Sequence, residues 1–521
     1  MIRLRGACLK GHIRKQLAGH SCGHAVKPFF EIPLQPAAKG SREAGRCLYL
    51  QLRDAIRDGR LLPGARLPPT RDARGVFGVS RNTAAEVYER LTNEGYSVAR
   101  QGSGTFVAEA LPTAPARVAS KGIDAARHLN AFWLSKEVTA AMGFWRDAPA
   151  PSPGGNRAVD LRPALVDSRL FPFAVFRRVM AKQLRTLERK PATYKSPQGN
   201  QGHYPLRDAI TRHIALTRAV VCAADDVLVT SGAQQAFGLL ARALVVPGQT
   251  VVAVEDPGYP PMRVAFAAAG AKLVPVAVDD KGLIVEQLPP DTGVICLCPS
   301  HQFPIGVTMS AQRREALVDW ARAHGAVIVE DDYDGEFRYE DNPLAALRTP
   351  AAADVVFYVG TFSKCMLPAL RMGFIVAPEW AMPTLIAAKN ALDWHCPVPM
   401  QMAVAAFIAE GHLAQHVRKM RQVYRQRRKL LFETLRADFA RWLDPVPSSY
   451  GMHLGAYARA TVDSERVAET LLQRYQVKLH SFSRYYLGWP ANAGLIFGYG
   501  TAGPAELKHG LGCLLEVLTN S

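Results

Sequence analysis

A lysine behind a buried strand is the residue of this sequence best suited to covalent chemistry. Lys364 follows the apolar run 355–359 and the hydroxyl residues Thr361 and Ser363. An amine becomes nucleophilic when burial or a nearby positive charge lowers its pKa, and Arg371 supplies such a charge. Arg371, Thr361 and Ser363 can also bind one phosphate group. The segment suits Schiff-base chemistry on a phosphorylated ligand, although a lysine at a strand end is more often a solvated surface charge.

Two polar side chains end the apolar run 326–329. Asp331 and Tyr333 are alternate residues, so in an extended chain both point the same way. Asp331 could pair with a protonated pyridine nitrogen, and Tyr333 could donate a hydrogen bond to a phenolic oxygen of the same ring. Taken alone, residues 330–333 would be interpreted as an acidic turn.

Further loops also follow apolar runs. The run 227–229 leads into a helix whose first residues are small and can hold an anion, namely Ser231, Gly232 and Ala233. Tyr259 follows the run 251–254 and can stack on a flat ring. Another loop, 299–306, follows a run that starts at Val294. In a parallel sheet all of these loops meet at one edge, where α/β proteins bind their ligands.

The elements that must position these side chains follow an α/β pattern. From about residue 161, short apolar runs alternate with helical stretches such as 312–324, which predicts a mainly parallel sheet. Later come a basic helix, strands near 451–458 and a final helix. We therefore expect a large α/β domain over 161–395 and a smaller C-terminal α+β subdomain over 396–521.

Residues 41–109 predict a winged helix-turn-helix, which is a small α+β domain. An apolar spacing typical of a helix runs through 48–56, and Thr70 and Ser80 can cap a second and a third helix. Two short strands then flank a glycine turn at 101–104.

The recognition helix of such a motif enters the major groove of DNA with its N-terminal end. Here Arg81 can pair with guanine and Asn82 with adenine. The residues suited to phosphate contacts are Ser80, Thr83 and Arg71. Gly102 and Gly104 let the backbone at the hairpin tip approach the minor groove. Either arginine taken alone would be interpreted as a solvated surface charge.

Composition and the remaining segments limit the partners. Lys and Arg number 63 against 45 Asp and Glu, a net charge of +18, which favours nucleic acid or an anionic ligand. No apolar run is long enough for a membrane span, and the nine cysteines lack the spacing of a disulfide framework or a metal site. We expect no metal and a reducing cytoplasm.

Residues 1–40 are expected to be a basic disordered arm, able to touch DNA phosphates, or a misassigned start. Residues 110–160 are expected to be a linker, part of which can dock or form a helix.

Longer stretches resemble two known families. Residues 48–107 resemble the GntR-family winged helix, and the matching stretches are "GVSRNTAAEVYERLTNEGY" and "RQGSGTFVAE". Residues 160–515 resemble the fold-type I pyridoxal-phosphate aminotransferases. They look more narrowly like the aminotransferase domains of MocR-type regulators, through "CPSHQFPIG", "VEDDYDGEFRY" and "GTFSKCMLPALRMGF". Winged helix, long linker and aminotransferase-like domain, in that order, is the MocR architecture.

This resemblance implies pyridoxal 5′-phosphate as the cofactor. Lys364 would form the Schiff base, Asp331 would pair with the pyridine nitrogen, and Tyr333 would meet the phenolic oxygen. Tyr259 would stack on the ring. The residues that would hold the phosphate are Ser231, Gly232, Ala233, Thr361, Ser363 and Arg371. The family also builds this site at the interface of a homodimer.

The sequence departs from the family in places that concern the substrate. The arginine that usually binds the substrate carboxylate is missing from 494–499, and the usual Asn-Pro-x-Gly loop begins with Phe303. The segment from Tyr194 to Arg207 is a few residues longer than the usual spacing of the family's Tyr…Gly…Leu-Arg pattern. His453 is a candidate to face an effector. These departures weaken amino-acid turnover more than cofactor binding.

We therefore expect a homodimeric transcription regulator that binds promoter DNA and senses pyridoxal phosphate or an amine that reacts with it. One alternative is a working aminotransferase with a fused DNA-binding module. Another is a scaffold whose aminotransferase-like domain only dimerises.

Overall fold

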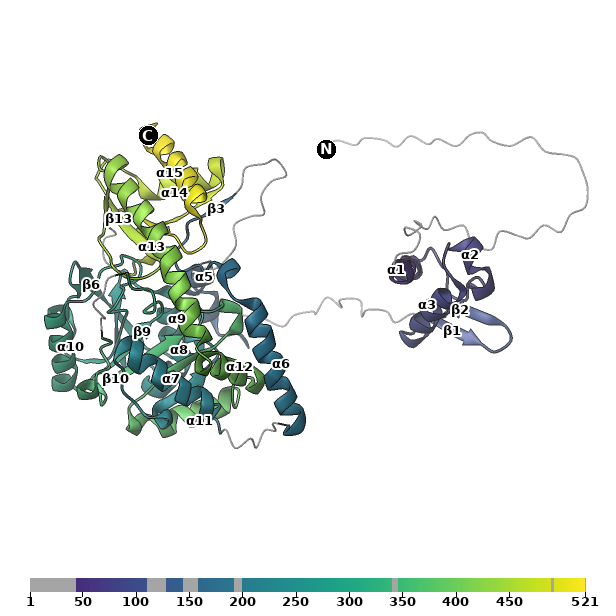
Figure 1. The fold of residues 1–521 in the computed structure, drawn as a ribbon, viewed down its shortest axis with the longest axis horizontal. Helices are drawn as coiled ribbons and strands as arrows, with labels where there is room; N and C mark the ends of the chain where they lie inside the picture. The colour runs from purple at the N-terminus through teal and green to yellow at the C-terminus, as the bar shows by residue number, and fades with distance from the viewer. Residues whose placement is uncertain are drawn as a thin grey trace, which may run out of the picture. The chain divides into compact units, whose positions relative to one another are not determined.

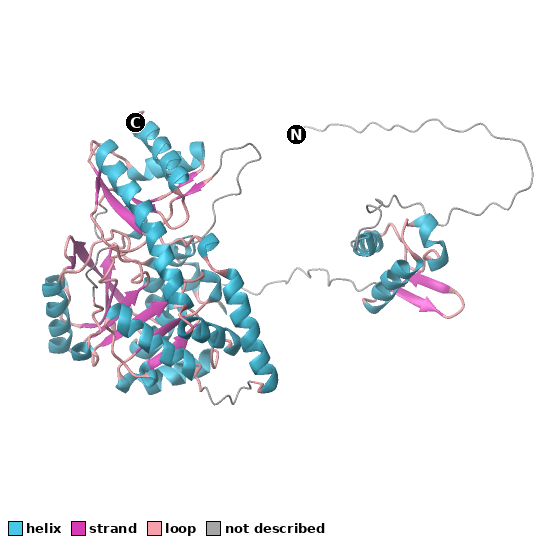
Figure 2. Cartoon of the chain, viewed as in Figure 1, coloured by secondary structure: helices cyan, strands magenta, loops and turns pink. Residues whose placement is uncertain are grey.

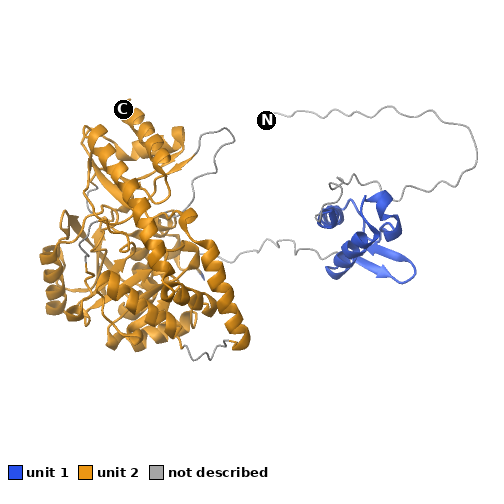
Figure 3. Ribbon diagram, viewed as in Figure 1, with its two compact units in different colours: residues 1–128 blue, residues 129–521 orange. Residues whose placement is uncertain are grey.

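The computed structural model describes residues 44–109, 128–143, 158–191, 199–339, 345–488 and 492–520. Two compact units, residues 1–128 and 129–521, make up the chain, and each is described by itself (Figure 3). The expected arm over 1–40, most of the expected linker, and Tyr194 lie outside the described residues.

The N-terminal unit combines helices with one β-hairpin (Figure 1). Its elements are α1 (Ala44–Arg57), the 3-10 helix η1 (Thr70–Asp72), α2 (Ala73–Val76), α3 (Arg81–Asn93) and the antiparallel strands β1 (Ser97–Arg100) and β2 (Gly104–Val107). Leu52, Ile56 and Leu91 are fully buried in the core that α1 and α3 share. The predicted winged helix-turn-helix is confirmed.

An eight-stranded sheet forms the centre of the larger unit, with the strand order β4-β11-β10-β9-β8-β5-β6-β7. The strands are β4 (Val227–Thr230), β5 (Val251–Asp256), β6 (Lys272–Asp279), β7 (Gly282–Leu283), β8 (Thr292–Leu297), β9 (Val327–Asp332), β10 (Val356–Thr361) and β11 (Gly373–Val376). Strands β6, β5, β8, β9 and β10 pair in parallel. Strand β11 runs antiparallel between β10 and β4, which makes β4 parallel to β10. The predicted α/β fold with a mainly parallel sheet is confirmed.

Helices cover both faces of this sheet (Figure 2). Successive residues of a strand point to opposite faces, and here the residues on both faces are apolar and need cover. Leu228 and Phe357 pack with α8 (Ala233–Leu244), α9 (Pro260–Ala268) and α11 (Met382–Leu392). Their neighbours Val229 and Tyr358 face the other side, where they meet α6 (Phe173–Arg189), α7 (Tyr204–Arg218), α12 (Val398–Ala409) and α13 (His412–Asp438). Helix α10 (Ala311–His324) packs on β8 and β9 through Leu317.

A four-stranded antiparallel sheet forms the C-terminal subdomain, with the order β12-β13-β16-β15. Its elements are β12 (Leu443–Pro445), β13 (His453–Ala458), α14 (Ser464–Tyr475), β15 (His480–Ser481), β16 (Gly494–Gly498) and α15 (Pro504–Thr519). Beside them, β3 (Val159–Asp160) pairs in parallel with β14 (Val477–Lys478). The segment that precedes α6 therefore lies against the C-terminal subdomain.

Helix α12 begins just after residue 396, where the sequence places the boundary between the two subdomains. Helix α12 packs against α6 and α7 of the large subdomain. Its residues are almost all apolar, and Ala403, Val404 and Phe407 are fully buried. A helix that is apolar on all sides needs neighbours all around it, and only the large subdomain supplies them. Helix α12 therefore packs as part of the core that α6 and α7 form.

Part of the stretch expected to be a linker is folded onto the larger unit. Residues Ala131–Leu134 form the 3-10 helix η2, and Lys136–Gly143 form α5. Helix α5 contacts α9, and its own residues Val138 and Ala141 are buried. No described helix is long and apolar enough to cross a membrane.

Candidate functional site

The carboxyl ends of β4, β5, β8, β9 and β10 lie at one edge of the sheet, since these strands run in the same direction. Loops that follow four of them, and the end of β9, line one cavity of about 870 Å³. The predicted residues on its wall are Ala233, Tyr259, Asp331, Tyr333, Thr361, Ser363, Lys364 and Arg371. Ser231 and Gly232 do not line this cavity but contact Arg371 beside it. The structure thus brings the whole predicted set to one place.

Lys364 is buried in this cavity with its amine already engaged. Its Nζ donates a hydrogen bond of 2.6 Å to the carbonyl oxygen of Ala164. The pKa of Lys364 is lowered from its ordinary 10.5 to about 8, mainly by burial and to a smaller extent by the positive charge of Arg371, against the opposing charges of Asp334 and Asp331. A large fraction of the amine is therefore neutral near pH 8, which is what a nucleophile requires.

Asp331 has a buried carboxyl group that lacks a full set of partners. Its Oδ1 is buried without a hydrogen-bond partner among the described residues, and its Oδ2 has the thiol of Cys298 at 3.8 Å. Burial, followed by the charges of Asp332 and Asp334, raises the pKa of Asp331 to about 8. A buried, unpartnered carboxyl oxygen fits a positively charged donor such as a protonated pyridine nitrogen.

The other end of the cavity has the donors that a phosphate group needs. The guanidinium of Arg371 donates to the Ser231 carbonyl oxygen at 2.8 Å, beside the N-terminus of α8. Gly232 has a φ of 79°, and a Cβ there would lie 2.9 Å from an Nη atom of Arg371. Thr361 Oγ1 accepts from the Ser363 amide at 3.2 Å, which places both hydroxyls together. A helix N-terminus, a guanidinium and two hydroxyls make a site for a dianion.

Aromatic side chains also line the cavity, among them Tyr259, Phe303 and Tyr333. Tyr259 and Phe303 meet edge to face, with ring centroids 5.6 Å apart. Phe303 also meets Tyr333 at 6.0 Å. Phe303 stands where the aminotransferase pattern has an asparagine, so this part of the wall is apolar.

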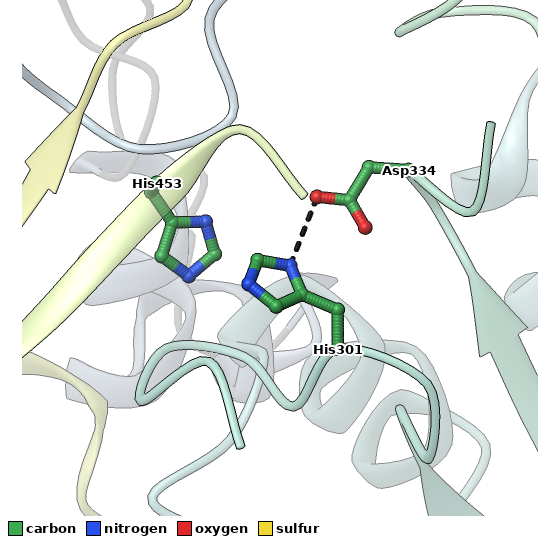
Figure 4. A group of neighbouring side chains, drawn as sticks. All are labelled: His301, Asp334 and His453. Atoms are coloured by element: carbon green, nitrogen blue, oxygen red, sulfur yellow. Dashed lines mark hydrogen bonds and ion pairs between the residues drawn. The ribbon is translucent and has the colours of Figure 1, made fainter. Parts of the chain in front are cut away.

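Behind Tyr333 lies a buried polar cluster that the sequence did not reveal. The Tyr333 hydroxyl donates to the His301 carbonyl oxygen at 3.0 Å and lies 2.9 Å from His301 Nδ1. His301 Nδ1 also lies 3.0 Å from Asp334 Oδ2, and Figure 4 shows the His301 ring between Asp334 and His453. Such contacts fix the orientation of a phenol. The loop 299–306 was recognised as a strand-end loop, but nothing in its spacing assigned this role to His301.

His453 belongs to this buried polar cluster and is not among the residues that line the cavity. It is fully buried, and its Nε2 donates to the Pro304 carbonyl oxygen at 3.1 Å. Burial and the neighbouring His301 hold the pKa of His453 well below its usual range. Ligand atoms of His301, Asp334 and His453 lie within 4.8 Å of one another, near enough for one ion. The contacts to Tyr333, Asp334 and Pro304 use His301 Nδ1 and His453 Nε2, whereas His301 Nε2 and His453 Nδ1 have no hydrogen-bond partner among the described residues. Because His301 contacts the Tyr333 hydroxyl directly, we interpret the cluster as support for Tyr333.

A buried ion pair holds the end of β9 in place. Arg218 Nε donates to Asp332 Oδ2 at 2.6 Å, and the Tyr358 hydroxyl donates to the same oxygen at 2.5 Å. Arg218 also donates to the Ser300 hydroxyl at 2.5 Å. This network joins α7, β9, β10 and the loop after β8, and so fixes Asp331 one residue away. Sequence reasoning had no signal for Arg218, which is far from Asp332 in the chain.

The folded part of the expected linker completes the cavity wall. Trp133 of η2 and Val138, Ala141 and Met142 of α5 line it. The sequence predicts that part of this stretch can dock or form a helix, but its pattern gives no signal that Trp133 lines a site.

In the N-terminal unit, the predicted DNA-reading residues lie at the start of α3. Ser80 is its N-cap, and its Oγ accepts from the Thr83 amide at 3.1 Å. Arg81 and Asn82, the first residues of α3, are exposed. Arg71 of η1 leaves 80% of its side chain exposed beside Asp72. These cations are therefore available to a ligand.

The hairpin tip carries the predicted glycines and cations that were not predicted. Gly102 and Gly104 have positive φ values of 74° and 109° and are exposed. The guanidinium groups of Arg100 and Arg66 lie 4.9 Å and 5.9 Å from the centre of the Phe106 ring. Stacking on an aromatic ring orients both guanidinium groups without neutralising them, and Arg100 is also paired with Glu109 at 3.2 Å.

Comparisons with protein families match both units. The model of bacterial regulatory proteins of the gntR family matches residues 45–107, and that of aminotransferase class I and II matches residues 168–491. The solved structure of an archaeal alanine:glyoxylate aminotransferase covers 77% of this chain and 100% of its own, with a TM-score of 0.69 and 21% identity. The kynurenine aminotransferase of Pyrococcus horikoshii covers 78% of this chain and 98% of its own, with a TM-score of 0.66 and 23% identity.

Full-length relatives combine the same two parts. The probable rhizopine catabolism regulatory protein MocR of Rhizobium meliloti is 33% identical over 90% of this chain and 92% of its own. The HTH-type pyridoxine biosynthesis transcriptional regulator PdxR of Corynebacterium glutamicum is 31% identical over 87% and 90%. The HTH-type transcriptional regulator TauR of Rhodobacter capsulatus is 31% identical over 95% and 99%.

Proposed function

Since the chain belongs to the MocR-type regulators, which join a GntR-type winged helix to a class I and II aminotransferase domain, we propose that its larger unit binds pyridoxal 5′-phosphate to control promoter binding. The observation that carries this proposal is the content of one cavity. A buried lysine, a buried carboxyl oxygen without a partner and a phosphate cradle meet there. The protein works as a cytoplasmic homodimer with an amine as its effector.

At the reacting end, the bound cofactor supplies an electrophilic aldehyde carbon. About a tenth of the Lys364 amine is neutral at pH 7 and half at pH 8, far more than for an ordinary lysine, because burial lowers its pKa to about 8. Asp331 would hold a proton against the ring nitrogen, and the Tyr333 hydroxyl would turn its single hydrogen from the His301 carbonyl oxygen to the phenolic oxygen. His301 and Asp334 keep the Tyr333 hydroxyl in place.

At the other end, the protein binds the phosphate and covers the ring. Arg371 supplies the positive charge, and Thr361 and Ser363 supply hydroxyl donors. The amides at the start of α8, around Ala233, add the positive end of a helix dipole. Tyr259 stacks on the ring and limits the access of water.

Regulation fits the site better than amino-acid turnover. Strand β16 occupies the stretch where the family usually carries its substrate-binding arginine, and its central residues Leu495, Ile496 and Phe497 are fully buried. An arginine there would normally fix the carboxylate of an amino acid for repeated chemistry. Its replacement by apolar side chains supports the sensing of a ligand over its conversion.

The test is footprinting of the full-length protein on the DNA upstream of its own gene, with and without pyridoxal phosphate. Wild type should protect a defined sequence, and the cofactor should change the protected pattern. Lys364→Ala should protect the same DNA but lose the response to the cofactor. Borohydride should trap the cofactor on wild type and not on Lys364→Ala.

Lys272→Ala, which removes an exposed lysine of the same unit, is the matched control and should behave as wild type. A trapped adduct that persists in Lys364→Ala would overturn the cofactor assignment. Failure of wild type to protect any defined sequence would overturn the assignment of DNA binding.

A further inference from the structure

The cavity beside Lys364 extends beyond the predicted cofactor residues along a largely apolar wall. Its apolar wall is made by Trp133, Val138 and Met142 from the segment that precedes the core, and by Leu165, Val166 and Phe303. Trp133 and Met142 line the cavity yet remain 55% and 62% exposed, so part of their apolar surface is still uncovered. A ligand with an apolar body would cover that surface and gain the free energy of its burial.

The charges in the described wall do not favour a second anionic group. Its cationic side chains are Lys364, which is used for covalent attachment, and Arg371, which belongs to the phosphate cradle. Asp331 is part of the wall, and the buried acids Glu255 and Asp334 lie close enough to perturb the pKa values of Asp331 or its neighbours. A carboxylate brought in with the amine would therefore be desolvated beside acids and rings without a cation to pair with.

We propose that the effector is a primary amine with an apolar body and no carboxylate on the amine-bearing carbon, and that its body lies against η2 and α5. This inference rests on the proposed function, because it places the amine at the cofactor held by Lys364. It makes the segment that leads toward the N-terminal unit part of the effector site.

The first experiment compares ligands that differ by one carboxylate. Full-length protein loaded with pyridoxal phosphate is titrated with phenethylamine and with L-phenylalanine, and the change in visible absorbance gives each apparent Kd. Phenethylamine should bind about tenfold more tightly or better. Equal binding, tighter binding of L-phenylalanine, or binding of neither compound overturns the inference.

The absorbance of the loaded protein before titration separates this test from that of the proposed function. If borohydride traps no cofactor on Lys364, the proposed function itself fails. If the cofactor is trapped but the amino acid binds as well as the amine, then only the inference about the effector fails.

The second experiment tests the contact with η2. Trp133→Ala should lower the preference for phenethylamine over methylamine by about fivefold, because methylamine has no body to reach that wall. Leu216→Ala, which removes an 85% exposed side chain on α7, is the matched control and should leave the preference unchanged. An unchanged preference in Trp133→Ala overturns the placement of the ligand body.

Discussion

The Nζ atom of Lys364 donates a hydrogen bond of 2.6 Å to the carbonyl oxygen of Ala164, a residue 200 positions earlier in the chain. Ala164 has a φ of 61°, in the left-handed region, which costs an L-residue with a side chain about 1–2 kcal/mol. The acceptor is a neutral carbonyl, so the bond holds the amine in the cavity without requiring it to stay charged. The resting geometry thus presents an amine that is ready to react.

The pKa of Lys364 predicts how fast the cofactor-free protein captures pyridoxal phosphate at each pH. Since the pKa is lowered to about 8, the neutral amine should increase about tenfold between pH 7 and pH 9 and then level off. Stopped-flow absorbance with wild type measures this rate. A rate that keeps rising to pH 10 in parallel with that of free lysine would contradict the lowered pKa.

The lowered pKa of Lys364 also affects the stability of the cofactor-free protein. The unfolded chain keeps this proton up to its ordinary pKa of 10.5, so burial of the amine destabilises the cofactor-free protein below about pH 8. This penalty is lost as the pH rises from 8 towards 10.5. Lys364→Met should therefore stabilise the cofactor-free protein more at pH 7 than at pH 10, as denaturant unfolding would measure.

Asp331→Asn should separate stability from cofactor binding. Burial raises the pKa of Asp331 to about 8, so at pH 7 the site disfavours an ionised carboxylate. Removal of that penalty should stabilise the cofactor-free protein by about 1–4 kcal/mol in denaturant unfolding. The same change should weaken cofactor binding about tenfold or more, because an amide cannot pair with a protonated ring nitrogen. A variant that loses stability as well would mean that Asp331 has a structural partner.

The exposed arginines of the N-terminal unit predict two different effects on DNA binding. Arg81→Ala should cost about 1–3 kcal/mol per half-site and relax sequence preference, if Arg81 reads a base. Arg71→Ala should weaken binding to all sequences alike, as loss of a phosphate contact does. Fluorescence anisotropy with specific and scrambled DNA distinguishes the two. Arg81→Ala with unchanged affinity and preference would remove the base-reading role.

The N-cap of α3 predicts the stability of the DNA-reading helix. Ser80→Ala removes the acceptor for the Thr83 amide and should destabilise the N-terminal unit by about 1 kcal/mol. Ser80→Gly should cost a few tenths of a kcal/mol, since glycine lets water reach that amide. Hydrogen exchange of the α3 amides in the full-length protein measures both, and equal exchange in the two variants would argue against the cap.

Two exposed apolar side chains on one helix support the proposed homodimer. Phe173 and Leu184 of α6 are 56% and 49% exposed in the single chain. A winged helix has a small footprint on DNA, so useful affinity is expected from two of them acting together. Sedimentation at micromolar concentration with cofactor present should give a dimer. A monomer under those conditions would leave each N-terminal unit to bind DNA alone.

The sequence by itself determined the two folds, and it predicted that most of the candidate cofactor residues lie at one edge of the sheet. Apolar spacing located the buried faces of α1 and α3, and Ser80 marked where α3 begins. Apolar runs located the strands, and parallel strands must bring their carboxyl ends to one edge. Lys364 and Asp331 could therefore be placed in one site without knowing a single contact between them.

Only the tertiary structure decided what surrounds those residues. Ala164 beneath Lys364, Arg218 against Asp332, and Trp133 in the cavity wall come from distant parts of the chain. Local periodicity reports which face of an element is buried, but it does not report which distant side chain meets that face. The same limit applies to α12, because the sequence of an apolar helix shows that it is buried without showing between which neighbours.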